Sequence, residues 1–191
     1  MVERYARVEM TKNWPQHARY AAWLEVEKAA VKAWNKLGLI PDSDCEKIIK
    51  NATFSVERIE EIEAITKHDL IAFNTSVSES LGEESRWFHY GMTSSDAVDT
   101  GVAIQMRDSL KIIIEDVKML MESIKKRALE HKMTLMVGRS HGIHGEPITF
   151  GLTLAVWYDE VARHLLILSK QWKLSLLDKF QEQWEILHTH H

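Results

Sequence analysis

Residues 96–132 read DAVDTGVAIQMRDSLKIIIEDVKMLMESIKKRALEHK, and this stretch decides the fold class. It contains one glycine, Gly101, and no proline, and its apolar residues recur with a helical period. A helix over the whole stretch would be about 55 Å long at ~1.5 Å per residue. Because a helix of that length needs partners along its sides, the sequence predicts a helical bundle and an all-α fold.

The rest of the chain shows the helical period in shorter pieces. Gly38 ends the first piece, Ser55 begins a later one, and Pro147 is expected to begin the helix that follows the long one. No segment alternates in the manner of a strand, so we expect a small N-terminal helical domain over residues 1–92 and the first long helices of a bundle over 93–166. The elements expected in the first domain are an extended arm over 1–13, helices over 15–37, 41–50, 55–65 and 70–81, and a loop over 82–91.

Composition and charge exclude several classes of function. A net charge of −4 over 191 residues gives no basic surface for nucleic acid or an anionic membrane. No apolar run approaches the ~20 residues that span a bilayer, and the first residues do not resemble a signal peptide. Cys45 is the single cysteine, which excludes an internal disulfide and fits a reducing cytoplasm.

The stretch Gly138-Arg139-Ser140-His141-Gly142-Ile143-His144-Gly145-Glu146-Pro147 concentrates polar chemistry between two long helical patterns. We expect a polar turn there, because glycines let the backbone approach a ligand closely and functional groups gather on loops. The spacing of His141 and His144 beside Glu146 could suggest a metal site. Cysteines and further carboxylates are lacking, so no metal is expected.

Three further polar clusters interrupt the helical pattern: Arg4-Tyr5, Thr66-Lys67-His68-Asp69 and His89-Tyr90-Gly91-Met92-Thr93-Ser94-Ser95-Asp96. Each also has a purely structural interpretation, as a surface pair, a helix cap and the N-cap of the long helix. The functional counterpart for the last is an anion at the helix start, where free N–H groups and the dipole favour negative charge.

Taken in order, the four clusters resemble the adenylosuccinate lyase family of the aspartase/fumarase superfamily, over residues 1 to about 165. Ser140 stands where the family usually has threonine, which keeps the hydroxyl, and Gly145 stands where alanine is common. The resemblance implies an all-α homotetramer with a central bundle of long helices and active sites built from three subunits. It also implies elimination of fumarate from adenylosuccinate and from the succinyl-carboxamide ribotide of the purine pathway, without a metal or organic cofactor.

The resemblance assigns the nucleotide side of the substrate to the first two clusters. Arg4 and Tyr5 would hold the phosphate of this small-molecule nucleotide. Lys67, His68 and Asp69 would line the nucleotide, with His68 placed to stabilise negative charge.

The other two clusters would act on the succinyl group. Thr93 and Ser94 would bind one of its carboxylates, and His89 and Ser140 would be substrate contacts or supports. His141 would be the general acid that protonates the departing nitrogen, since an imidazole titrates near the working pH.

In the family the base is a serine on a mobile loop that lies far beyond residue 191, so this chain is expected to be inactive alone. Residues 167–191 no longer match the family. A shifted reading frame with freely chosen codons restores a glycine-rich family motif near Phe180, so we expect an out-of-frame tail.

Two alternatives stay open. One is another fumarate-releasing lyase of the superfamily, such as an argininosuccinate lyase. The other is a helical fragment without catalysis that only associates with itself, because a shortened bundle exposes apolar helix faces.

Overall fold

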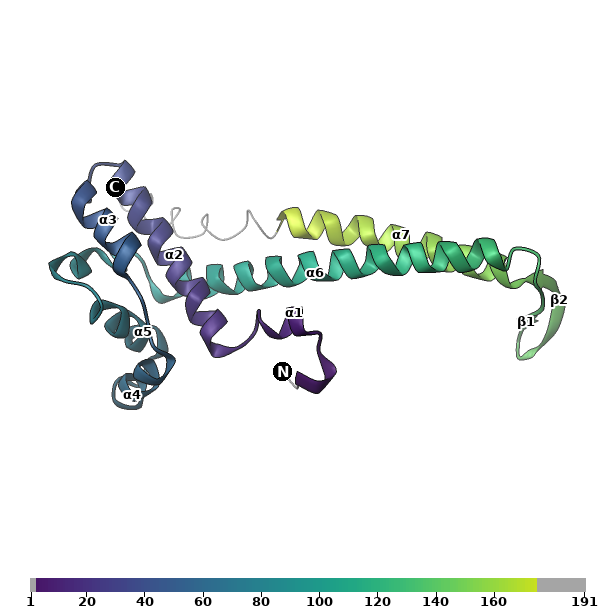
Figure 1. Ribbon diagram of the computed structural model, residues 1–191, viewed down its shortest axis with the longest axis horizontal. Helices are drawn as coiled ribbons and strands as arrows, with labels where there is room; N and C mark the ends of the chain where they lie inside the picture. Colours follow the sequence, from purple (N-terminus) through teal and green to yellow (C-terminus); the bar gives the residue numbers. More distant parts are fainter. Residues whose placement is uncertain (1–2, 175–191) are drawn as a thin grey trace, which may run out of the picture. The chain divides into compact units, whose positions relative to one another are not determined.

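A computed structural model describes residues 3–174 of the 191-residue chain. Helices make up most of its regular structure, which confirms the all-α prediction, and one two-stranded sheet is the exception (Figure 1). The elements are η1 (Glu3–Tyr5), α1 (Val8–Thr11), α2 (Gln16–Lys36), α3 (Asp42–Asn51), α4 (Val56–Thr66), α5 (Asp69–Ser78), η2 (Glu83–Trp87), α6 (Ser94–Glu130), β1 (Leu135–Ser140), β2 (Ile143–Thr149) and α7 (Phe150–Leu174).

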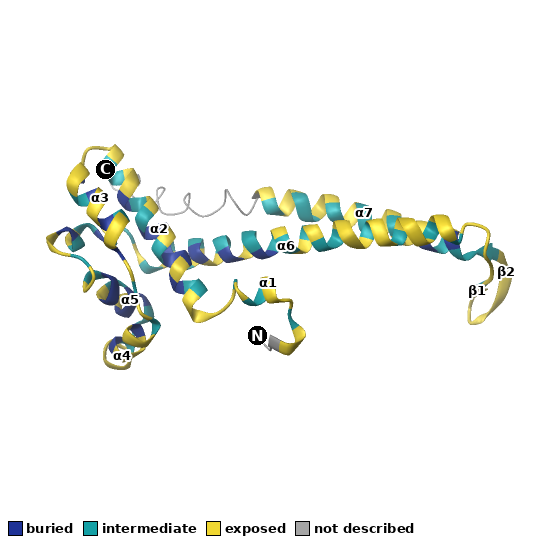
Figure 2. Ribbon diagram, in the orientation of Figure 1, coloured by how far each residue is buried: buried dark blue, intermediate teal, exposed yellow. Residues whose placement is uncertain are grey.

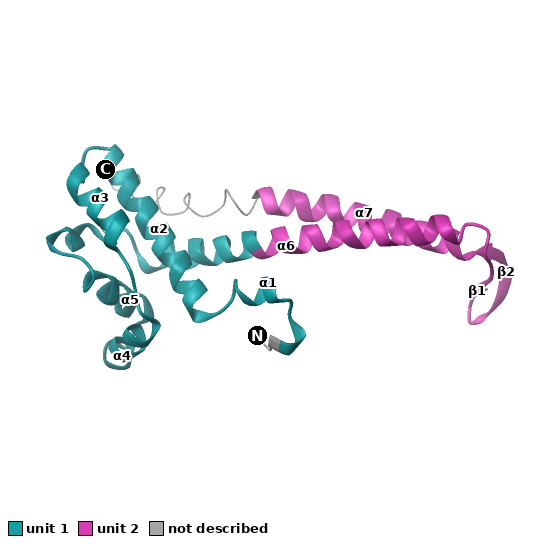
Figure 3. Ribbon diagram, in the orientation of Figure 1, with its two compact units in different colours: residues 1–108, 176–191 teal, residues 109–175 magenta. Residues whose placement is uncertain are grey.

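The chain divides into two compact units, which Figure 3 colours separately. The first unit runs to Asp108, and the second begins at Ser109, inside α6. The domain boundary expected from the sequence, between residues 92 and 93, lies just before this helix and stays a prediction. So does the assignment of residues 167–191 to a separate tail: α7 continues to Leu174, and residues 175–191 lie outside the described part of the chain.

The N-terminal segment differs from the extended arm expected over residues 1–13. Glu3–Tyr5 form a 3-10 turn and Val8–Thr11 form one helical turn. Backbone hydrogen bonds from the N–H groups of Met10 and Thr11 to the carbonyl of Arg7, both 3.0 Å, close that turn. Short-range bonding of this kind leaves no apolar periodicity, so the sequence pattern could not indicate it.

An aromatic cluster forms the centre of unit 1. Tyr20 of α2 and Phe73 of α5 stack with ring centroids 5.9 Å apart, and Trp23 meets them edge-on at 5.3 and 5.5 Å. All three side chains are almost completely buried. Figure 2 shows buried positions on α2, α5 and the first turns of α6, where these helices bring together residues that are far apart in the sequence.

The long helix was predicted over 96–132, and α6 spans Ser94–Glu130, which confirms it. Its start is held closely against α2. A Cβ atom on Gly101 would lie 2.6 Å from Cδ1 of Trp23, so the missing side chain lets the two helices approach. Gly101, the one glycine of the predicted long helix, is therefore a packing contact.

A β-hairpin occupies the stretch that was expected to be a polar turn between helices. β1 and β2 pair antiparallel, with a change of register between Val137 and Arg139. Pro147 lies within β2, opposite Val137, so the expectation that it begins a helix was wrong. Thr149 caps α7 instead: its Oγ1 accepts from the N–H of Leu152 at 3.2 Å.

The helices of unit 2 are joined tightly at the hairpin end and sparsely buried elsewhere. The N–H groups of Phe150 and Gly151 donate to the carbonyls of Thr134 and His131 at 2.9 and 3.0 Å. Leu154 is the one large hydrophobic residue of this unit that is buried, among those that the structure describes. None of the described helices combines the length and hydropathy that crossing a bilayer requires.

Replacing Gly101 by alanine tests the contact with Trp23. In a helix without close neighbours this change stabilises by up to about 1 kcal/mol. Here we expect a loss of about 1–3 kcal/mol, because the added methyl overlaps the buried Trp23 ring and one of the two must shift. Urea unfolding measures the change. Val102→Ala, at an exposed position of the same helix, should stay within about 0.5 kcal/mol of the parent. A more stable Gly101→Ala variant would contradict the contact.

Candidate active site

The predicted cluster Thr66–Asp69 connects α4 to α5, and its residues shape the connection. Lys67 ends α4 in the left-handed region, with φ of 55°. His68 is the N-cap of α5, where its Nδ1 accepts from the N–H of Ile71 at 3.4 Å. The side chains of His68 and Asp69 are each 41% exposed. The capping interpretation therefore holds, and because the cap uses Nδ1, the Nε2 atom of His68 stays available to a ligand.

An ion pair closes the other end of this helix pair. Arg58, near the start of α4, donates to both carboxylate oxygens of Glu79, just after α5, at 2.7 and 2.9 Å. The bond to Arg58 lowers the pKa of the Glu79 carboxyl. The helices α4 and α5 are thus joined by the connecting segment at one end and by the Arg58–Glu79 ion pair at the other.

The loop between η2 and α6 carries His89, and side chains of α2 and α3 hold it. Asp44 accepts from the indole N–H of Trp87 at 2.9 Å. Trp34 donates its indole N–H to the carbonyl of Tyr90 at 3.0 Å. These contacts join residues more than 40 positions apart, so local sequence patterns could not reveal them.

Glu27 makes the closest contact to this loop, and the sequence analysis missed it. One carboxylate oxygen accepts the backbone N–H of His89 at 3.0 Å, and the other lies 2.6 Å from Nδ1 of the imidazole. The Glu27 side chain is completely buried and that of His89 is 23% exposed. A signal existed: Glu27 lies four residues after Trp23 and four before Val31, on the buried face of α2. A charge on such a face needs a partner.

Thr93 and Ser94 lie at the start of α6, as predicted. The carboxylate of Asp96 reaches back to accept the N–H of Thr93 at 2.9 Å, as in a capping box. Among the residues that the structure describes, no hydrogen bond engages the two hydroxyls. The start of a 37-residue helix therefore presents N–H groups and two free hydroxyls, which suits an anion.

His141 and Ser140 lie at the tip of the β-hairpin. Ser140 pairs with Ile143, so His141 and Gly142 form a two-residue turn, and both have positive φ, 54° and 77°. This combination is typical of a type I′ turn, whose twist matches that of the strands. The imidazole of His141 is exposed. The hairpin thus presents the predicted acid at the end of a short, regular support.

Three of the predicted residues have an uncommon backbone conformation. Lys67, His89 and His141 are the non-glycine residues with positive φ among those described. Such conformations are uncommon for residues with a side chain and tend to occur at functional sites. Each of the three belongs to a different predicted cluster.

Not all of the predicted residues are brought together. Arg4 and Tyr5 are exposed, and the Arg4 guanidinium lies 4.7 Å from the ring centroid of Tyr5. No hydrogen bond within the described residues joins the 67–69 segment to His89, Thr93 or Ser94. Ser140 and His141 belong to unit 2, whereas the other predicted residues belong to unit 1. The roles of all these residues stay predictions.

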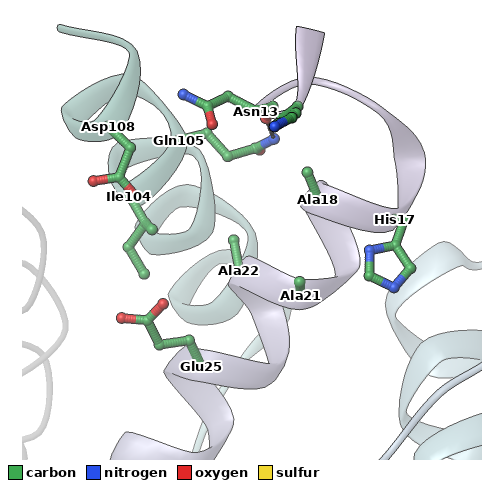
Figure 4. A pocket seen from close by; sticks show the side chains of 10 residues that line it. Asn13, His17, Ala18, Ala21, Ala22, Glu25, Ile104, Gln105 and Asp108 are labelled. Atoms are coloured by element: carbon green, nitrogen blue, oxygen red, sulfur yellow. Dashed lines mark hydrogen bonds between the residues drawn. The ribbon is translucent and has the colours of Figure 1, made fainter. Parts of the chain in front are cut away.

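A polar groove of about 290 Å³ lies elsewhere in unit 1, between α2, α6 and the N-terminal segment (Figure 4). Gln105 donates to the carbonyl of Asn13 at 2.6 Å at one end, and Glu25 and Asp108 contribute carboxylates. None of the predicted site residues lines it. Across residues 3–174, no group of three or more histidine, cysteine or acidic side chains is placed to hold a metal ion.

Replacing Gly142 by alanine tests the turn that carries His141. A Cβ atom there meets nothing within 4 Å, so only the backbone conformation opposes it, at about 1–2 kcal/mol. We expect faster amide hydrogen exchange in β1 and β2. Gly145→Ala is the matched control, because its Cβ would make an ordinary contact, 3.4 Å from the carbonyl of Gly138. Equal exchange in the two variants would contradict the left-handed turn.

Comparison with known proteins gives close relatives in sequence. The chain is 64% identical to an adenylosuccinate lyase of Helicobacter pylori and 49% identical to one of Bacillus subtilis, each over 165 residues. The aligned part is 86% of this chain and 38% of each relative, so the chain spans well under half of their length. The expected resemblance to this family is confirmed over the aligned part.

Solved structures share the fold. A fumarate lyase from Mesorhizobium sp. BNC1 has a TM-score of 0.82 at 27% identity, over 87% of this chain and 40% of that one. A 3-carboxy-cis,cis-muconate lactonizing enzyme from Pseudomonas putida has a TM-score of 0.75 at 28% identity, over 84% and 38%. The Lyase family matches residues 4–178, which is most of the sequence. The chain therefore belongs to the Lyase family.

Proposed function

We propose that this chain carries the acid-bearing and nucleotide-binding part of an adenylosuccinate lyase. The observation that carries the proposal is the 64% identity over 165 residues to a protein of that name. The reaction releases fumarate from adenylosuccinate to give AMP, and from the succinyl-carboxamide ribotide of the same pathway. No metal or organic cofactor takes part in the proposed reaction.

His141 is the proposed general acid. In the elimination a base removes a proton from the carbon next to the C–N bond, that electron pair forms the new double bond, and the nitrogen leaves with the C–N pair. Protonation of the nitrogen by His141 makes it a better leaving group. The exposed imidazole at the hairpin tip supports this role, and Ser140 is its neighbour there.

The substrate-binding roles are proposed from the chemistry of the side chains and of the helix start that carries them. Thr93 and Ser94 are proposed to bind a succinyl carboxylate, which the free hydroxyls at the start of α6 support. Lys67, His68 and Asp69 are proposed to line the nucleotide. His89 is a further substrate contact.

Arg4 and Tyr5 are proposed to hold the nucleotide phosphate. The guanidinium can bind phosphate through two parallel hydrogen bonds, and both side chains are exposed. No residue within 3–174 pairs with them besides each other.

Other copies of the chain are proposed to complete the site, in a homotetramer. Large apolar side chains of α6 and α7 are exposed, among them Met119, Leu152, Trp157 and Leu166 at 51–66%. Apolar surface of this extent favours association. The proposed compartment is the cytoplasm, which suits a chain with one free cysteine.

Complementation tests the proposed function. The chain is mixed with the Helicobacter pylori enzyme inactivated at the histidine that corresponds to His141, and fumarate release is followed by ultraviolet absorbance. We expect activity, because this chain supplies the acid and the relative supplies the base. The chain alone should be inactive. The His141→Gln variant of this chain is the matched control and should give at least a hundredfold less activity. Equal activity with this variant would exclude His141 as the acid.

Light scattering tests the proposed association. The chain has a mass of 22.1 kDa, and we expect a multiple of it in solution. Trp157→Glu places a charge on the exposed apolar surface of α7 and should shift the equilibrium towards the monomer. Gln171→Glu adds the same charge at an exposed polar position of this helix and should leave the mass unchanged. A monomeric parent chain would contradict the proposal.

A further inference from the structure

A buried carboxylate and a partly exposed imidazole form a pair of which the proposed function uses only the imidazole. Glu27 is completely enclosed, and both of its oxygens face His89. Within residues 3–174 no other residue forms an ion pair or hydrogen bond with it. A buried carboxylate is costly unless hydrogen bonds and charge offset its lost hydration, so this contact has to be maintained.

The hydrogen-bond chemistry of the pair fixes which ring nitrogen carries a proton. An ionised carboxylate only accepts hydrogen bonds. The backbone N–H of His89 occupies one oxygen, and the other oxygen lies 2.6 Å from Nδ1. Facing an ionised Glu27, Nδ1 can only be the donor of this contact, in the neutral ring as well as in the cation. In a histidine, the bond made by one nitrogen sets the state of the other.

The remaining nitrogen, Nε2, is the one that a ligand can reach. It has no hydrogen-bond partner among the described residues, and the side chain is 23% exposed. We propose that Glu27 is a positioning residue that holds His89 as its Nδ1–H tautomer, so that Nε2 meets the substrate. This rests on the proposed function for the substrate, a nucleotide that carries hydroxyl and anionic groups. Neutral Nε2 accepts from a hydroxyl, and protonated Nε2 donates to an anion.

Glu27 also holds the backbone of the loop. His89 has φ of 62°, and its N–H is bound by Glu27. Two residues on, Gly91 has φ of 71°, and a Cβ there would lie 3.1 Å from the Trp34 ring. The same carboxylate therefore holds both the ring and the backbone N–H of His89, while Trp34 packs closely against the chain at Gly91.

The test is the Glu27→Gln variant, which keeps the shape of the side chain. Glutamine has one oxygen to accept the backbone N–H, and its NH₂ group then faces Nδ1 as a donor. We expect the neutral ring to switch to the Nε2–H tautomer. The ¹⁵N spectra of the histidine-labelled chain, recorded where the histidines are neutral, report this directly, and His89→Asn identifies the signals. Glu25→Gln, at an exposed position of the same helix, should leave the tautomer unchanged.

The tautomer of His89 in the unsubstituted chain already tests the proposal. A neutral His89 with its proton on Nε2 would overturn the proposal, even if the Glu27→Gln variant failed to fold. Circular dichroism checks the fold of the variant. An unchanged tautomer in a folded Glu27→Gln variant would overturn it equally.

The second readout is the complemented enzyme. With Glu27→Gln we expect KM for adenylosuccinate to rise about tenfold, the effect of one misdirected hydrogen bond, with a smaller change in kcat. An unchanged KM together with a switched tautomer would remove His89 from substrate binding and overturn the inference. If the parent mixture is inactive, the proposed function fails, while the tautomer result still decides whether Glu27 positions His89.

Discussion

Covering a 37-residue helix is the constraint on which the rest of the structure depends. Most of the stability of a helix in a protein comes from packing one of its faces against other elements. The first turns of α6 find that cover on α2, where Gly101 lets the indole of Trp23 lie against the helix axis. The same approach joins the start of α6, with Thr93 and Ser94, to the aromatic core. The position of the helix start that carries Thr93 and Ser94 thus depends on the packing of a glycine.

Three residues with a left-handed backbone conformation show how a mostly helical chain can direct side chains away from a helix axis. Each is held by a different device. Lys67 ends a helix and its backbone N–H donates to the carbonyl of Glu63 at 2.9 Å, His89 is bound by a buried carboxylate, and His141 shares a two-residue turn with a glycine. A helix spreads its side chains evenly around an axis, so a residue that must point elsewhere has to leave the helix. In this chain, the residues that leave the helices lie in the polar clusters that interrupt the helical periodicity of the sequence.

The sequence predicted the helices well because apolar periodicity is a local signal. α2, α4, α5 and α6 follow it, and the N-cap at Ser55 was correct, with its Oγ accepting from the N–H of Arg58 at 3.3 Å. The hairpin was missed because its strands are exposed and carry glycines, so they show no alternation of apolar and polar residues. Glu27 was missed because its partner lies 62 positions away. The chemistry of the candidate residues was indicated only by their resemblance to a family, since side-chain type alone does not fix a role.

Gly151, at the start of α7, is the point where that helix comes closest to α6. A Cβ atom there would lie 2.5 Å from the carbonyl oxygen of Ala128 and 2.6 Å from Cα of Lys132, so the backbones of α6 and α7 touch at this point. Beyond it α7 extends for about 35 Å at ~1.5 Å per residue, and Leu154 is its one large hydrophobic residue that is buried along the described part. The absence of a side chain at Gly151 is therefore what allows the backbones of the two longest helices to come this close.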